Sequence, residues 1–94
     1  MLYLVAGVLK DGSEEKLIAL RDEFNQHLSQ PFRTISLAGL LRDREGKRKG
    51  YVAIIEATDF DDAEAYLKQS PFYSEGLYER TEVAAFDAEI GTLE

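Results

Sequence analysis

The sequence predicts an α+β fold, because four β-favouring runs and two helical patterns alternate in the order β-α-β-β-α-β. A polar turn closed by glycines joins the two middle β runs, as in an antiparallel hairpin. The length of 94 residues suffices for one domain. Together these observations predict a single domain over residues 1–94. Its expected form is a ferredoxin-like βαββαβ sandwich, with both helices on one face of a four-stranded antiparallel sheet.

The first third of the chain predicts a strand followed by a helix. Residues 2–9 form an almost entirely apolar run, which is typical of a strand covered on both faces. Ser13 stands at the start of the helix as an N-cap residue, and Pro31 stands where the helix should already have ended. The apolar face of this helix consists of Leu17, Leu20, Phe24 and Leu28.

The middle of the chain predicts a hairpin. Residues 32–41 and 51–55 both favour β structure, and the turn between them, residues 42–50, carries five basic and two acidic residues. This basic turn indicates either a region that steers an anionic substrate or a solvated tip that discourages pairing of sheet edges.

The last third predicts the second helix and the final strand. Thr58 or Asp59 can cap the helix, and the acidic residues of its first turn suit the helix dipole. Residues 78–86 form the last strand. The inward face of the second helix is expected to carry Phe60, Ala63, Leu67 and Ser70.

The strand at residues 51–55 is apolar on both sides, because Tyr51, Ala53 and Ile55 alternate with Val52 and Ile54. In a two-layer domain the helices cover only one face of the sheet, so the other face would be exposed to water. We expect a second copy of the sheet to cover it, which predicts a homodimer formed through the sheet face.

The composition excludes several classes of function. The chain has no cysteine, which rules out disulfides and thiolate sites, and one histidine cannot form a multi-histidine metal site within a chain. Acidic residues outnumber basic ones 18 to 11, which disfavours a nucleic-acid partner. There is no phosphate-binding glycine loop, no apolar run of about 20 residues and no signal-peptide pattern. We therefore expect a cytoplasmic protein with no cofactor, no metal and no membrane partner.

The segment 70–78, Ser-Pro-Phe-Tyr-Ser-Glu-Gly-Leu-Tyr, resembles the signature of the YciI-like (YCII-related) family. In that signature an acidic residue, a proline and an aromatic residue are followed by three variable positions, a glycine, an aliphatic residue and an aromatic residue. Residues 38–41, Ala-Gly-Leu-Leu, and the stretch 56–65 resemble further parts of the family pattern. The resemblance implies a dimeric α+β barrel of ferredoxin-like subunits with a small-molecule cleft between helices and sheet, related to muconolactone-isomerase-like enzymes.

The resemblance also implies a catalytic pair, which consists of a histidine on the first helix and the acidic residue before the proline. This chain departs from the pattern at both positions. Ser70 replaces the acidic residue, and His27 lies later on the helix than the family histidine, with which a residue near Asp22 aligns.

His27 is the candidate general acid or base, because its side chain has an ordinary pKa near neutrality. It lies at the border of the apolar face of its helix, where a histidine faces either a cleft or solvent. Ser70 is the second catalytic candidate, through a hydroxyl that binds the ligand, and capping of the turn before Pro71 is the alternative.

The candidates for substrate binding are one arginine and three aromatic residues. Arg33 can bind a carboxylate through two hydrogen bonds, or it can form a structural pair with Glu56 or Glu82. The aromatic residues either line a substrate pocket or close the core. They are Phe72, Tyr73 and Tyr78.

These observations predict a YciI-like protein that acts as a cofactor-independent enzyme, with lyase- or isomerase-type acid/base chemistry on a small anionic organic substrate. One alternative is a non-catalytic small-molecule-binding or accessory dimer of the same fold. Another is a structural dimer whose open sheet face serves only for association.

Overall fold

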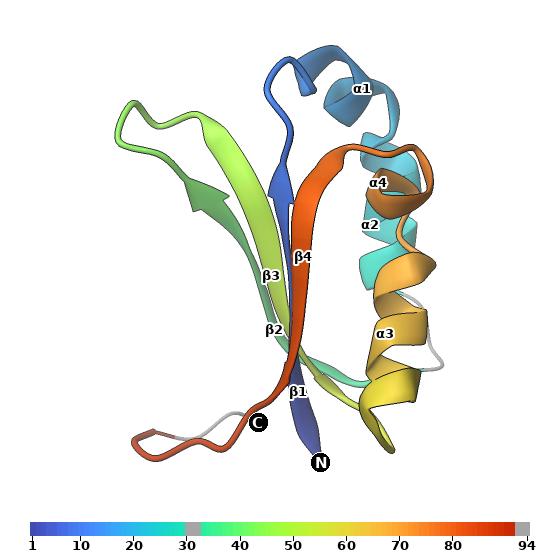
Figure 1. Cartoon of the computed structure of the whole chain (residues 1–94), viewed down its shortest axis with the longest axis vertical. Coiled ribbons are helices and arrows are strands. Elements are labelled where there is room, and N and C mark those ends of the chain that lie inside the picture. Colours follow the sequence, from blue (N-terminus) through green and yellow to red (C-terminus); the bar gives the residue numbers. More distant parts are fainter. Residues whose placement is uncertain (30–32, 92–94) are drawn as a thin grey trace.

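A computed structural model describes residues 1–29 and 33–91 and confirms the predicted α+β architecture (Figure 1). One antiparallel sheet has the strand order β2-β3-β1-β4. The strands are β1 (Leu2–Leu9), β2 (Ile35–Arg42), β3 (Arg48–Glu56) and β4 (Tyr78–Ala85). The helices are α1 (Glu14–Ala19), α2 (Arg21–Leu28), α3 (Phe60–Lys68) and α4 (Pro71–Ser74). Helices α2, α3 and α4 lie on one face of the sheet (Figure 1).

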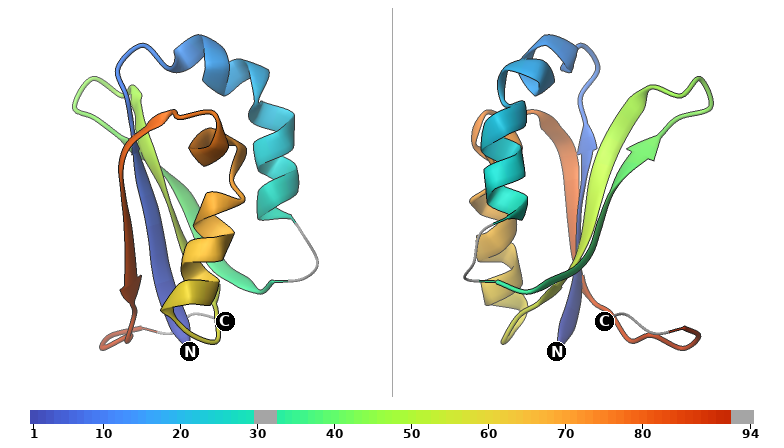
Figure 2. Two further views of the ribbon diagram at one scale, coloured as in Figure 1. Left: turned by 45° about the vertical axis from the view of Figure 1, so that its right-hand side comes forward. Right: turned by 180° about the vertical axis from the view of Figure 1, so that it is seen from behind.

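The predicted first helix is two helices in the structure. α1 and α2 meet at Leu20, whose φ and ψ of −98° and 4° depart from helical values. Figure 2 shows α1 turned across the end of the sheet while α2 runs along it. This arrangement lets Leu17 of α1 and Phe24 of α2 enter the same buried cluster. The predicted helix end at Pro31 and the first residue of the predicted second strand, Phe32, lie outside the described residues.

Both predicted helix starts are confirmed, but the side chains of the two N-cap residues make different hydrogen bonds. Asp59 caps α3, since its carboxylate accepts a hydrogen bond of 2.8 Å from the backbone N–H of Asp62. Ser13 precedes α1, but its hydroxyl donates to the carbonyl oxygen of Lys10 at 2.7 Å instead of accepting from the helix. The prediction that Phe60 faces inward is wrong. Its side chain is 49% exposed, because it lies in the first turn of α3, at the rim of the core.

The register of the central strands determines which side chains the helices cover. Tyr3 of β1 lies opposite Ile55 of β3, and Val5 lies opposite Ala53. All four side chains are buried against α3. A second buried cluster lies nearer α1, α2 and α4 and consists of Leu9, Leu17, Phe24, Phe72 and Leu77.

Within residues 1–29 and 33–91, no helix covers the opposite face of the sheet (Figure 1). Leu37 and Leu41 of β2 are 57% and 37% exposed. An apolar pocket, bordered by Leu37, Ile54 and Ile90, shows that the segment after β4 approaches this face. In the described part of the chain, no helix is long and apolar enough to cross a membrane.

Candidate functional site

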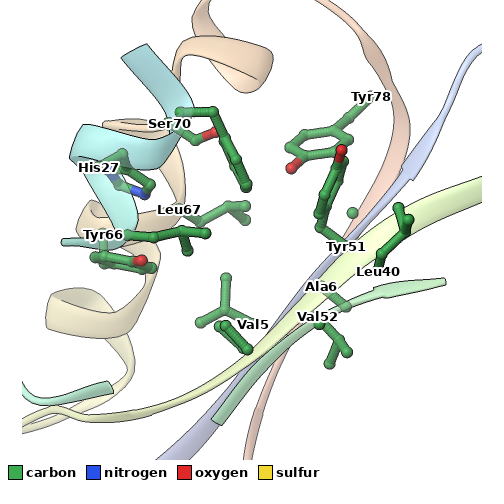
Figure 3. Close-up of a pocket in the computed structure, with 16 residues that line it drawn as sticks. Val5, Ala6, His27, Leu40, Tyr51, Val52, Tyr66, Leu67, Ser70 and Tyr78 are labelled. Carbon is green, nitrogen blue, oxygen red and sulfur yellow. The ribbon is translucent and has the colours of Figure 1, made fainter. Parts of the chain in front are cut away.

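A cavity of about 210 Å³ lies between the sheet and helices α2 and α3 (Figure 3). Its helical wall consists of Phe24, His27, Leu28, Tyr66, Leu67 and Ser70. Its sheet wall consists of Val5, Ala6, Gly7, Ala38, Gly39, Leu40, Tyr51, Val52, Ala53 and Tyr78. The lining is therefore mostly apolar and aromatic, with a few polar atoms, as in many small-molecule sites.

His27 lies in the last turn of α2 and lines this cavity. Its imidazole stacks on the ring of Tyr66, with ring centroids 4.2 Å apart and planes inclined by 22°. Burial and, to a smaller degree, the positive charge of Arg33 lower the pKa of His27 below its ordinary value of 6.5. The imidazole is thus neutral at pH 7 and able to accept a proton.

Arg33 lies behind Tyr66 and does not line the cavity. Its guanidinium binds the carboxylate of Asp62 through two hydrogen bonds of 2.8 and 3.1 Å, and it donates to the carbonyl oxygen of Glu56 at 3.0 Å. This pairing holds the pKa of Asp62 well below its usual range and raises that of Arg33. Of the two alternatives for Arg33, the structure shows a structural ion pair, but its partner is Asp62 on α3 and not Glu56 or Glu82. Arg33 and Asp62 are 29 residues apart in the chain, so no local pattern in the sequence indicates that they pair.

Ser70 and Tyr78 meet at one end of the cavity. The Ser70 hydroxyl accepts a hydrogen bond of 3.3 Å from the backbone N–H of Phe72, which caps α4, and it lies near the Tyr78 side chain. Burial raises the pKa of Tyr78 to about 12. A side chain on Gly7 would overlap the Tyr78 ring, so the ring can lie across β1 only because residue 7 is glycine.

The sequence profile of the YCII-related domain matches residues 1–87. The chain belongs to the YCII-related domain family. A sequence search of curated proteins finds no significant match to this YCII-related domain.

Several solved structures share the fold of this YCII-related domain. One is 5-chloro-2-hydroxyhydroquinone dehydrochlorinase (TftG) from Burkholderia phenoliruptrix AC1100, in complex with 2,5-dihydroxybenzoquinone. It is 22% identical over 93% of this chain and 94% of its own, with a TM-score of 0.82. SnoaB, a cofactor-independent oxygenase from Streptomyces nogalater, is 22% identical over 99% and 96%, with a TM-score of 0.50. An uncharacterized NIPSNAP domain protein from Burkholderia xenovorans is 11% identical over 97% of both chains, with a TM-score of 0.52.

The predicted site residues of the YCII-related domain divide into two groups. His27, Ser70 and Tyr78 come together around the cavity (Figure 3). Phe72 is 1% exposed and lies behind the wall, stacked on Phe24 with centroids 4.2 Å apart. Tyr73 is 37% exposed and borders a separate polar groove between α3 and β4. The structure therefore brings Phe72 and Tyr73 to neighbouring regions but not into the lining.

Sequence reasoning missed most of the lining, including Tyr66, Tyr51 and Gly7. Tyr66 lies three residues after Ala63, at the edge of the inward face of α3, so helical spacing could have indicated it. Tyr51 shares the covered face of β3 with Ala53, but only the strand register shows that it reaches the cavity. For Gly7 the sequence holds no signal, because its role depends on a ring more than seventy positions away in the chain.

Proposed function

We propose that this YCII-related domain is a cofactor-independent enzyme that moves a proton on a small ring compound, with His27 as the base. The observation that carries the proposal is the half-buried imidazole of His27 on the wall of a cavity that is otherwise mostly apolar and aromatic. A base of this kind is most useful in its neutral form, which the lowered pKa maintains at pH 7. Removal of a proton followed by loss of an anion, or by return of the proton elsewhere, needs no redox partner.

The size and lining of the cavity favour a single ring. A cavity of about 150 Å³ is large enough to hold benzene, so about 210 Å³ leaves room for a ring with small substituents. Within the described residues, the lining contains no lysine, arginine, aspartate or glutamate. It therefore suits a neutral hydroxylated ring that becomes anionic when it loses a proton, which refines the anionic substrate predicted from the sequence. The dihydroxybenzoquinone in the TftG complex is a ring of matching size. Its hydroxyl groups are as acidic as carboxylic acids, so at neutral pH it resembles the ring anion that proton loss would form.

A ligand screen tests the proposal. We expect hydroquinone and 2,5-dihydroxybenzoquinone to raise the melting temperature of the protein by several degrees at concentrations well above the dissociation constant. Benzoate is expected to have a smaller effect, because its negative charge lies on a carboxylate outside the ring and not on a ring oxygen. Absorbance spectra then show whether a substituted hydroquinone is converted. If no ring compound shifts the melting temperature, the proposal fails.

A second function, binding without turnover, is favoured by one observation. The family pattern places an acidic residue at position 70, whereas the Ser70 hydroxyl here accepts a hydrogen bond from the backbone of Phe72. Of the described residues, no carboxylate lines the cavity. Stabilisation by a ring compound without any conversion of chloro- or hydroxy-substituted hydroquinones would support this accessory role.

We also propose that two copies of the chain associate through the helix-free face of the sheet. The support is that Leu37 and Leu41 are exposed on this face. Apolar side chains of the neighbouring strands β1 and β3 lie on the same face. Light scattering is expected to give twice the mass of one chain at micromolar concentration. Leu37→Lys should shift the protein toward monomer, whereas Ile18→Lys, on α1, should not, although Ile18 is 70% exposed. A monomeric wild-type protein would contradict this arrangement.

A further inference from the structure

The hydroxyl group of Tyr66 has no partner that explains its burial. Tyr66 is 2% exposed. Its hydroxyl oxygen is closed to solvent and has no hydrogen-bond partner in the part of the chain that the structure describes. An unpaired buried donor destabilises a folded protein, so such groups are uncommon and often belong to a functional site.

The surroundings of Tyr66 place this hydroxyl beside the candidate base. Tyr66 and His27 line the same cavity, and their rings stack with centroids 4.2 Å apart (Figure 3). The guanidinium of Arg33 lies 5.4 Å from the centroid of the Tyr66 ring. That guanidinium donates two hydrogen bonds to Asp62. The Arg33–Asp62 ion pair therefore stabilises the position of the Tyr66 ring, and the Tyr66 hydroxyl takes no part in this contact.

We propose that the Tyr66 hydroxyl donates a hydrogen bond to the ligand oxygen on which negative charge forms when His27 removes a proton. This inference rests on the function proposed above and narrows its substrate class to rings that carry a hydroxyl or carbonyl oxygen. The proton moves to an imidazole nitrogen, and the electron pair of the broken bond becomes negative charge on the ligand. A ligand must displace a neighbouring side chain to reach the Tyr66 oxygen, because that oxygen is closed to solvent.

The chemistry of the two side chains is suited to these separate roles. A hydrogen bond to an anion is stronger than one to a neutral oxygen, so the Tyr66 hydroxyl would stabilise the charged state more than the bound neutral ring. Burial raises the pKa of Tyr66 to about 12, which keeps its proton in place at neutral pH. The same environment lowers the pKa of His27. Two neighbouring groups with oppositely shifted pKa values are typical of a donor and a base that act on one ligand.

The substitution Tyr66→Phe tests the inference, because it removes one oxygen atom and keeps the ring. Without ligand, the variant is expected to melt at the same temperature as wild type or higher, since no hydrogen bond is lost. With 2,5-dihydroxybenzoquinone as the probe, calorimetry should show an affinity about fivefold weaker, which corresponds to one hydrogen bond. Toluene, which has a ring but no oxygen, should bind both proteins equally. Tyr73→Phe is the matched control, because it removes a tyrosine hydroxyl outside the cavity.

The outcomes separate this inference from the function on which it rests. If wild type binds the quinone and Tyr66→Phe binds it equally well, the proposed hydrogen bond from Tyr66 is excluded. The proposal that the cavity binds a ring compound is then still supported. If Tyr66→Phe is less stable than wild type without ligand, the hydroxyl has a structural partner and the inference fails. If wild type binds neither the quinone nor toluene, the proposed function and this inference both fail.

Discussion

His27→Gln is expected to lower kcat/KM for a hydroxylated ring substrate by about 10²- to 10⁴-fold, the usual contribution of a general base. Glutamine retains a polar side chain of similar size but cannot accept a proton at neutral pH. His27 lines the cavity and stacks on Tyr66, so the loss should appear mainly in kcat while the affinity for 2,5-dihydroxybenzoquinone changes little. Circular dichroism is the control that establishes whether the variant is folded. Wild-type turnover in a folded His27→Gln protein would exclude His27 as the base.

The pH dependence of turnover provides a second measurement on the same residue. Burial and Arg33 both disfavour the imidazolium, so the pKa of His27 lies below 6.5 in the folded protein. We expect kcat/KM to be constant near pH 7 and to fall only at lower pH, as the base takes up a proton. The free energy of unfolding should also decrease as the pH falls below about 6.5, because the unfolded chain binds a proton that folded His27 resists. Since the chain has one histidine, an NMR titration reports this pKa directly. A value above 6.5 would show that burial and Arg33 do not control the pKa of His27 in this way.

Local patterns predicted most of the fold. The apolar run at residues 2–9 coincides with β1, and the hairpin follows from two β-favouring runs around a polar turn. These features depend on neighbours in the sequence, which is why the sequence reveals them. The break at Leu20 does not follow from local pattern, because the apolar spacing continues through it. It results from the packing of α1 across the end of the sheet, a tertiary effect.

The site was predictable only in part, because its geometry depends on distant pairs. His27 could be chosen from its chemistry alone, and Ser70 from its place before Pro71. The stacking of His27 on Tyr66 joins α2 to α3, and the passage of Tyr78 over Gly7 depends on the pairing of β1 with β4. Neither contact produces a repeated spacing in the sequence, so neither could be predicted without the sheet order.

Phe72→Ala is expected to lower the free energy of unfolding by about 3–5 kcal/mol, as for other large aromatic side chains removed from a core. The Phe72 side chain is 1% exposed and stacks on Phe24 with ring planes inclined by 9°. It also contacts the rings of Tyr51 and Tyr78, with centroids 5.3 and 6.3 Å away. Removing it would leave a void behind three residues that line the cavity. Urea unfolding at a fixed protein concentration measures the loss.

The neighbouring substitution Tyr73→Ala is the matched control for Phe72→Ala. Both residues lie on α4 and are aromatic, but Tyr73 is 37% exposed, so its removal should cost only about 1 kcal/mol. Under conditions where both variants are folded, Phe72→Ala should also weaken the binding of 2,5-dihydroxybenzoquinone, because Phe24, Tyr51 and Tyr78 lose their support. Tyr73→Ala should leave that binding unchanged. Equal losses of stability in the two variants would show that Phe72 is not the buried support that its contacts indicate.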